Sequence, residues 1–139
     1  MAAPYDRDAR VAQVADVVRR MTRALSTRDA ELVEGLLTDD VVYHFPGSNP
    51  MSGTYRGRDE VMAFFRRFPT TFDGPPIIET HDVLASEAHG ADLSQLVAER
   101  GGRRHTWRAV RIYHLAEERI SEVFVTIEDQ AAFDAFLSD

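Results

Sequence analysis

Apolar positions recur at steps of three and four residues in the first part of the chain, which is the spacing of one helix face. Residues 9–26 follow it through Val11, Val14, Val18, Met21 and Leu25. The stretch 26–29 has the form of a capping box, which predicts a second helix over 29–37. Further amphipathic helices are predicted over 57–68 and 130–137.

The pattern changes to an alternation of apolar and polar residues after residue 76, which is typical of β-strands. It predicts four consecutive antiparallel strands over residues 77–86, 91–100, 104–115 and 119–128. A short β-branched and aromatic strand is expected over 41–45. Because helices and strands are segregated, we expect an α+β fold, with a cone-shaped, curved antiparallel or mixed sheet wrapped around helices and enclosing a pocket. Residues 1–139 are expected to form a single domain.

The placement of the turns decides which strand residues share a face. Two-residue turns near 89–90, 101–102 and 117–118 would pair residues 84 with 95, 82 with 97, 93 with 110, 95 with 108, 112 with 123 and 110 with 125. The pocket face would then be mainly apolar, with a polar cluster of Asp82, Gln95 and Arg108.

The opposite face would hold large apolar side chains in this register. Trp107, Tyr113 and Phe124 would lie there together with Arg111. A monomer rarely exposes such a patch, so we expect a symmetric homodimer packed sheet against sheet.

Composition and charge narrow the classes of function. The net charge of −7 disfavours nucleic acid as a partner, and the absence of cysteine excludes disulfides and thiolate chemistry. The chain begins with charged residues and no apolar run, so we expect neither a signal peptide nor a membrane partner, and a cytoplasmic location. No nucleotide-binding or metal-ligand spacing is present, so neither a cofactor nor a metal is expected.

The stretch DDVVYHFPGSNPMSGTYRG over 39–57, followed by the helix ending at residue 68, resembles the nuclear transport factor 2-like superfamily. Within it, the chain is most similar to SnoaL-like polyketide cyclases and ketosteroid isomerases. The ending, with Tyr113, His114, Glu122, Phe124 and a Phe-rich last helix, fits the same pattern. This resemblance implies the cone-shaped fold, also described as cystatin-like, and a hydrophobic pocket. The superfamily includes isomerases, cyclases, dehydratases, epoxide hydrolases and proteins without chemistry, so it selects no reaction.

The same resemblance places the catalytic positions of ketosteroid isomerase on this chain. The position of the aspartate base falls on His44, and those of the two oxyanion donors fall on Met21 and Val110. Two apolar residues cannot donate hydrogen bonds to an enolate, so steroid isomerase activity of that type is not expected.

His44 is the main candidate for a general acid or base, because imidazole titrates near neutral pH. Its alternative is a pocket histidine that only hydrogen-bonds a ligand. Arg108, with Asp82 and Gln95, is a candidate to hold a substrate oxygen, and its alternative is a structural ion pair.

Aromatic and apolar side chains are the candidates for the pocket wall. Tyr55 and Trp107 can stack on a flat ligand, although core packing for Tyr55 and a dimer interface for Trp107 are alternatives. Other predicted ligand-binding residues are Met21, Met62, Phe65 and Val110.

The leading interpretation is a cofactor-independent enzyme acting on a small, hydrophobic, oxygen-bearing molecule by cyclisation, isomerisation, dehydration or epoxide opening. The first alternative is a binding protein for such a metabolite without catalysis. The second is an interaction protein that binds another protein through its sheet or loop surface.

Overall fold

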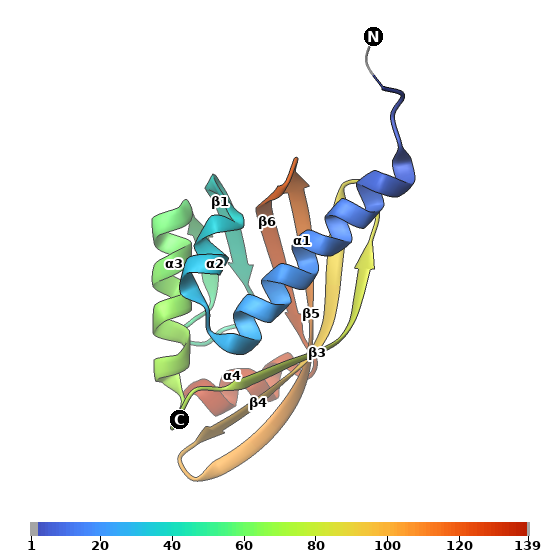
Figure 1. The fold of residues 1–139 in the computed structure, drawn as a ribbon. Coiled ribbons are helices and arrows are strands. Elements are labelled where there is room, and N and C mark those ends of the chain that lie inside the picture. The colour runs from blue at the N-terminus through green and yellow to red at the C-terminus, as the bar shows by residue number, and fades with distance from the viewer. Residues whose placement is uncertain (1–2, 139) are drawn as a thin grey trace.

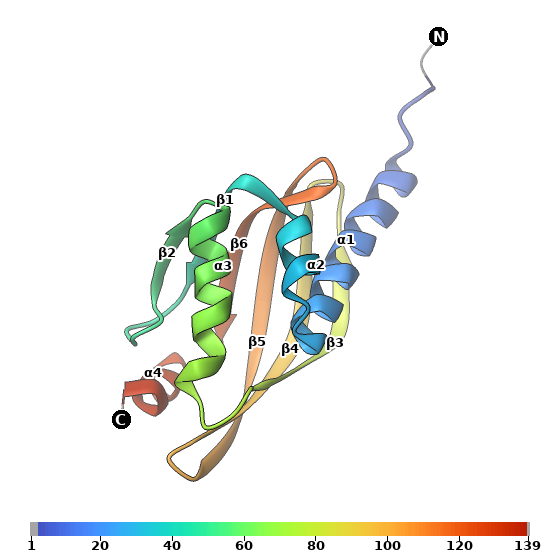
Figure 2. The ribbon, with the colours of Figure 1, turned by 60° about the vertical axis from the view of Figure 1, so that its left-hand side comes forward.

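In the part of the chain that the structure describes, six strands form one curved, unclosed mixed sheet in the order β2-β1-β6-β5-β4-β3 (Figure 1). The computed structural model describes residues 3–138. Helices α1, α2 and α3 lie against one face of the sheet, called the inner face here, and α4 crosses one end (Figure 2). The predicted α+β fold is therefore confirmed. The elements are α1 (Arg7–Thr27), α2 (Ala30–Gly35), β1 (Leu37–Phe45), β2 (Gly53–Arg56), α3 (Arg58–Arg67), a 3-10 turn (Phe68–Thr71), β3 (Ile77–Ala85), β4 (His89–Arg100), β5 (Arg103–Ala116), β6 (Arg119–Ile127) and α4 (Gln130–Ser138).

The first two helices are separated by a single left-handed residue and a cap. Asp6 caps α1 by accepting a hydrogen bond from the amide of Ala9, and Arg28 ends it with φ of 56°. Asp29 then caps α2 by accepting from the amide of Leu32. The helix predicted over 29–37 is too long, because Leu37 already pairs with Ile120 of β6 as the first residue of β1.

Strand β1 is longer than predicted and has two neighbours. It pairs antiparallel with β2, a short strand that the sequence pattern did not predict, and parallel with β6. Tyr43 and Phe45 are buried on the inner face, while His44 between them points to the other side.

The meander β3–β6 departs from the predicted register at three places. The β3–β4 turn spans 86–88, so Leu84 pairs with Ala91 and Asp82 with Leu93. This shift of four residues leaves the faces of 82–84 unchanged. A bulge at His81 then places Thr80 opposite Ser94 and exchanges the faces of residues 77–80. In the β5–β6 hairpin the predicted pairing holds for Leu115 with Ile120, after which Ser121 is left out of the ladder and His114 pairs with Glu122.

The bulge at Ser121 exchanges the faces of two strands. Val123 and Val125 face inward as predicted, but their partners are Tyr113 and Arg111 rather than Ile112 and Val110. Since the β4–β5 pairs follow the predicted register, the exchange extends into β4. The inner face of β4 and β5 consists of Asp92, Ser94, Leu96, Ala98, Trp107, Ala109, Arg111 and Tyr113.

Helix α4 closes one end of the cone through aromatic contacts. Phe133 and Phe136 pack edge-on against the indole ring of Trp107, with ring centroids 5.1 and 4.7 Å away. Asp134 ties this helix to the loop after β1 by accepting hydrogen bonds from the amide of Ser48 and the side chain of Asn49. No helix within residues 3–138 is long and apolar enough to cross a membrane.

Gly90 lets helix α1 approach the sheet closely, since a Cβ atom there would overlap the side chain of Val18. We expect Gly90→Ala to lower the free energy of unfolding by about 1–3 kcal/mol through overpacking. Gly35→Ala is the matched control, because beyond its own helix backbone and chain neighbours no heavy atom of the described residues lies within 4 Å of the added carbon. Urea denaturation of both variants measures the difference, and equal stabilities would contradict this account of the α1–sheet contact.

Candidate binding cavity

The inner face of the sheet and the helices enclose a cavity of about 160 Å³. Its wall is predominantly apolar. Contributions come from α1 and α2, from β1, from α3 and from the inner face of β3–β6. Core lining residues include Ala24, Val33, Tyr43, Phe45, Met62, Phe64, Phe65, Leu96, Ala109, Val125 and Ile127.

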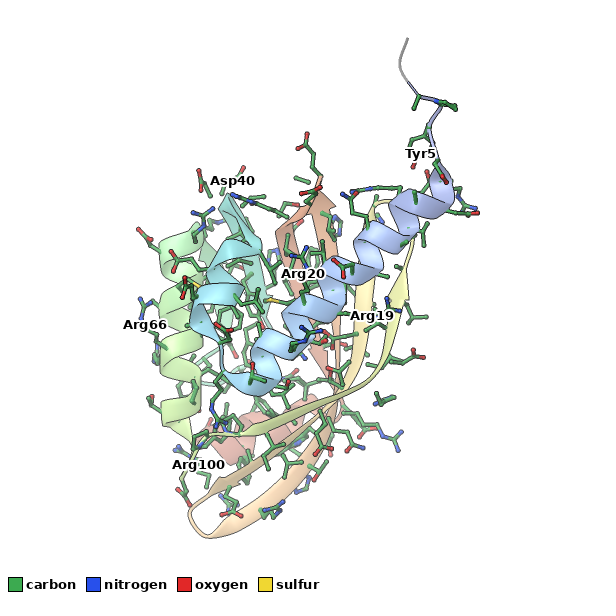
Figure 3. The ribbon with its side chains drawn as sticks, viewed as in Figure 1. Tyr5, Arg19, Arg20, Asp40, Arg66 and Arg100 are labelled. Atoms are coloured by element: carbon green, nitrogen blue, oxygen red, sulfur yellow. The ribbon has the colours of Figure 1, made fainter. Side chains whose placement is uncertain are left out.

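Charged residues mark where the cavity reaches the surface. Arg28 and Asp29 in the α1–α2 turn and Arg66 on α3 are exposed and also line the cavity. Figure 3 labels Arg66 on α3. Among the described residues that line the cavity, Asp29 is the one carboxylate. Its side chain is engaged in capping α2.

A polar cluster lies in the inner wall, built from two residues on each of two paired strands. Nε of Arg111 donates to Oδ2 of Asp92 at 3.0 Å, and Nη2 donates to Oγ of Ser94 at 3.1 Å. The hydroxyl of Tyr113 donates to Oδ2 of Asp92 at 2.5 Å, and Oγ of Ser94 donates to Oδ1 at 2.6 Å. Each oxygen of the Asp92 carboxylate therefore has a partner.

The cluster is almost wholly shielded from water. Arg111 is 7% exposed and Asp92 0%. Burial lowers the pKa of the Arg111 guanidinium, but Tyr113 and Asp92 outweigh it, and the pKa lies above its ordinary value. For Tyr113, burial acts in the other direction and raises the pKa of the hydroxyl well above its ordinary value. Arg111 is thus a cation and Tyr113 a neutral donor at neutral pH.

Two hydrogen-bond donors of the wall have no partner in the part of the chain that the structure describes. Within residues 3–138, neither Nη1 of Arg111 nor the hydroxyl of Tyr43 makes a hydrogen bond, and both residues line the cavity. Burial raises the pKa of the Tyr43 hydroxyl, so it keeps its proton. A ligand oxygen that accepts hydrogen bonds fits these donors, and the surrounding apolar wall strengthens such contacts by excluding water.

A family model described as the SnoaL-like domain matches residues 18–123. The chain belongs to the SnoaL-like domain family. This confirms the resemblance found in the sequence. An uncharacterised protein of Mycobacterium tuberculosis (strain ATCC 25618 / H37Rv) is 27% identical over 122 residues, covering 87% of this chain and 93% of its own.

Solved structures support the same fold. Bal32a, from a soil-derived mobile gene cassette, superposes with a TM-score of 0.86 at 25% identity, covering 92% of this chain and 98% of its own. TerC, co-crystallised with polyporic acid, has a TM-score of 0.79 at 15% identity, covering 90% and 98%. At this low identity, TerC shows likeness of fold alone.

Some predicted wall residues of this SnoaL-like protein line the cavity and others do not. Met62 and Phe65 line it, as predicted. Met21 is fully buried in the core outside the lining. Tyr55 packs on Phe64 and donates its hydroxyl to the carbonyl of Met51. Trp107 is buried against α4, so neither a dimer interface nor stacking on a ligand in this cavity agrees with its position.

The predicted polar cluster on the pocket face is wrong in its placement. Arg108 and Asp82 are exposed, and Gln95 and Val110 are half-buried, all on the face away from the helices, called the outer face here. The cause is the bulge at Ser121, which turns the other side chains of β5 and β4 inward. Asp82 also pairs with Leu93 rather than lying near Arg108, and its carboxylate bonds the amide of Val83.

His44 also lies on the outer face, contrary to the prediction that its ring points into the hollow. Its Nε2 lies 2.7 Å from Oε2 of Glu122 and its Nδ1 lies 3.1 Å from Oγ1 of Thr54. The ring stacks on Phe124 at a centroid distance of 4.4 Å. Its neighbours Tyr43 and Phe45 occupy the cavity side, because alternate residues of a strand face opposite ways.

Sequence reasoning missed the cluster of Arg111, Asp92, Ser94 and Tyr113, and the donor Tyr43. The signal was present, because Asp92-x-Ser94 and Arg111-x-Tyr113 are polar pairs at a spacing of two on strands whose mutual register was predicted correctly. Direct pairing of Asp92 with Arg111 points to an ion pair on one face. Within residues 3–138 no three His, Asp or Glu side chains come together as metal ligands.

Removing the guanidinium leaves the Asp92 charge buried without its cation. We expect Arg111→Met to lower the free energy of unfolding by about 3–5 kcal/mol. The matched control is Arg108→Met on the same strand, where an exposed side chain is replaced and a change within about 0.5 kcal/mol is expected. Guanidinium chloride denaturation measures the free energy of unfolding of both variants. An Arg111→Met variant as stable as the wild-type protein would refute the structural role of the pair.

Proposed function

We propose that this SnoaL-like protein binds a small, largely apolar, oxygen-bearing molecule in its cavity. One observation supports this most directly: an apolar wall carries two donors, Nη1 of Arg111 and the hydroxyl of Tyr43, that have no hydrogen-bond partner among the described residues. Pockets with apolar walls and a few convergent polar groups are the usual form of small-molecule sites. Under this proposal the two donors orient the ligand by its acceptor oxygen.

The cavity volume limits the size of the ligand. An engineered protein cavity of about 150 Å³ accommodates benzene, and the cavity of about 160 Å³ here is of that size. A single ring with a short oxygen-bearing substituent fits this space, whereas a four-ring steroid does not. The co-crystal of TerC with polyporic acid is an instance of a small molecule recognised by a protein of this fold.

Catalysis on such a ligand is the second candidate function. Donors held rigidly at an apolar site stabilise negative charge that develops on a substrate oxygen, as in enolate or epoxide chemistry. Asp29, a carboxylate at the mouth of the cavity, would be the base in this scheme. An acid–base role for His44 has no support from its position on the outer face. Cyclisation, isomerisation, dehydration and epoxide opening all remain within this scheme.

A homodimer packed sheet against sheet is part of the proposal, and the outer face supports it. One residue from each strand forms a continuous row across the sheet: Thr54, His44, Phe124, Ile112, Ala91 and Leu84. Leu84, Ile112 and Phe124 are 51%, 39% and 37% exposed. A second copy would cover this apolar row by the same row on itself.

Filling the cavity tests the binding proposal. We expect acetophenone to raise the melting temperature of the wild-type protein and progesterone, a four-ring steroid, to leave it unchanged. Ala109→Leu places extra carbons in the cavity and should abolish the acetophenone shift, whereas Ala63→Leu on the exposed side of α3 should retain it. Binding that survives Ala109→Leu, or that favours the steroid, would contradict the proposed site.

A charge in the apolar row tests the dimer. Phe124→Glu should convert the dimer to a monomer, because two carboxylates would be buried near the symmetry axis. Ala131→Glu, at an exposed position of α4, is the control and should leave the assembly unchanged. Sedimentation equilibrium at micromolar concentration gives the mass, and a monomeric wild-type protein would exclude the dimer.

A further inference from the structure

The charge balance of the cavity wall defines the chemical class of the ligand, if the proposed binding function holds. We infer that Asp92 is a specificity-determining residue that makes the cavity select a neutral carbonyl compound over the corresponding carboxylate. Asp92 does not contact the ligand in this scheme. It acts by cancelling the charge of Arg111, the group that does.

Only two charged side chains are buried within residues 3–138, and they are Asp92 and Arg111. The guanidinium and the carboxylate neutralise each other at 3.0 Å. The other charged lining residues, Arg28, Asp29 and Arg66, are exposed at the mouth, where water screens them. The inner wall therefore offers strong donors but no net charge.

A ligand carboxylate would bring an uncompensated charge into this interior. Its desolvation is costly unless a partner cation is available, and the partner cation is already committed to Asp92. The Nε and Nη2 edge of a guanidinium can bind a carboxylate through two parallel hydrogen bonds, and Asp92 and Ser94 already occupy that edge.

A neutral carbonyl avoids this cost. Its oxygen accepts hydrogen bonds from Nη1 of Arg111 and from the hydroxyl of Tyr43, which lack partners within residues 3–138. The two carboxylate oxygens of Asp92 accept hydrogen bonds from Arg111, Tyr113 and Ser94. Because these donors offset its negative charge, Asp92 does not repel the carbonyl oxygen of the ligand. The cavity volume restricts the class to compounds with about one ring.

Acetophenone and benzoate are the probes, because they share a ring and a carbonyl and differ mainly in a methyl group against a charged oxygen. Isothermal titration at pH 7.5 gives the two dissociation constants. We expect the wild-type protein to bind acetophenone about tenfold or more tightly than benzoate. Asp92→Asn keeps the size of the side chain and leaves Arg111 with a net positive charge, so the ratio should shift toward benzoate by about tenfold or more.

The ratio is measured on a single variant, so a loss of stability in Asp92→Asn cancels from it. Tyr43→Phe is the control, since it removes a donor without changing the charge and should weaken both ligands with little change in their ratio. If Asp92→Asn does not fold, the wild-type ratio still tests the preference for the neutral ligand.

Each result has a defined meaning. A wild-type preference for benzoate, or a ratio that Asp92→Asn leaves unchanged, overturns the role of Asp92 while leaving the binding function intact. Absence of binding by both probes at millimolar concentration overturns the proposed binding function itself, and the inference with it.

Discussion

The interior of this protein depends on one unpaired residue in a β-hairpin. Because Ser121 is left out of the β5–β6 ladder, Tyr113 and Arg111 rather than Ile112 and Val110 share a face with Val123 and Val125. Side chains alternate along strands, so this offset decides which half of β5 and β4 faces the helices. A hairpin without the bulge would turn Val110 and Ile112, together with Arg108, toward the helices and would put Arg111 and Asp92 on the outer face. The chemistry of the wall is therefore a consequence of backbone geometry.

Burying the pair of Arg111 and Asp92 costs free energy of folding, and this cost is relevant to what the pair does. Two ions removed from water lose much of their hydration energy, and apolar replacements of similar volume often give equal or greater stability. This pair sits among additional donors, with Tyr113 and Ser94 completing the coordination of the carboxylate. The network fixes the guanidinium in one orientation against a wall of aromatic and aliphatic carbon. Such rigidity is what a small ligand needs if a few polar contacts are to orient it.

The sequence allowed the fold to be predicted more reliably than the site, and the reasons differ by element. Periodicity located α1, α3, α4 and the four meander strands, because each covers enough residues to average out local exceptions. Strand β2 has only four residues, with none fully buried, so it left no pattern. The pocket residues depended on one-residue precision in the register, and Ser121 carries no local signal for a bulge. Met62 and Phe65 were found because helical faces tolerate such errors, whereas Arg108 and Asp82 were misplaced because strands do not. The predicted inward orientation of His44 was wrong for a related reason. Adjacent residues of a strand face opposite ways, and Tyr43 takes the inward position.

The strand order has a consequence for how the chain assembles. Strands β3 to β6 are joined by short hairpins, whereas β1 reaches its parallel neighbour β6 only across some eighty residues of intervening chain, from Val42 to Glu122. Closing a long loop costs more entropy than closing a tight turn, so the meander is favoured to form before β1 docks on its edge. The wall that carries Arg111 would then be complete while the wall that carries Tyr43 is still absent. A folding chain would thus expose the unpaired backbone groups along the edge of β6 until β1 pairs with them.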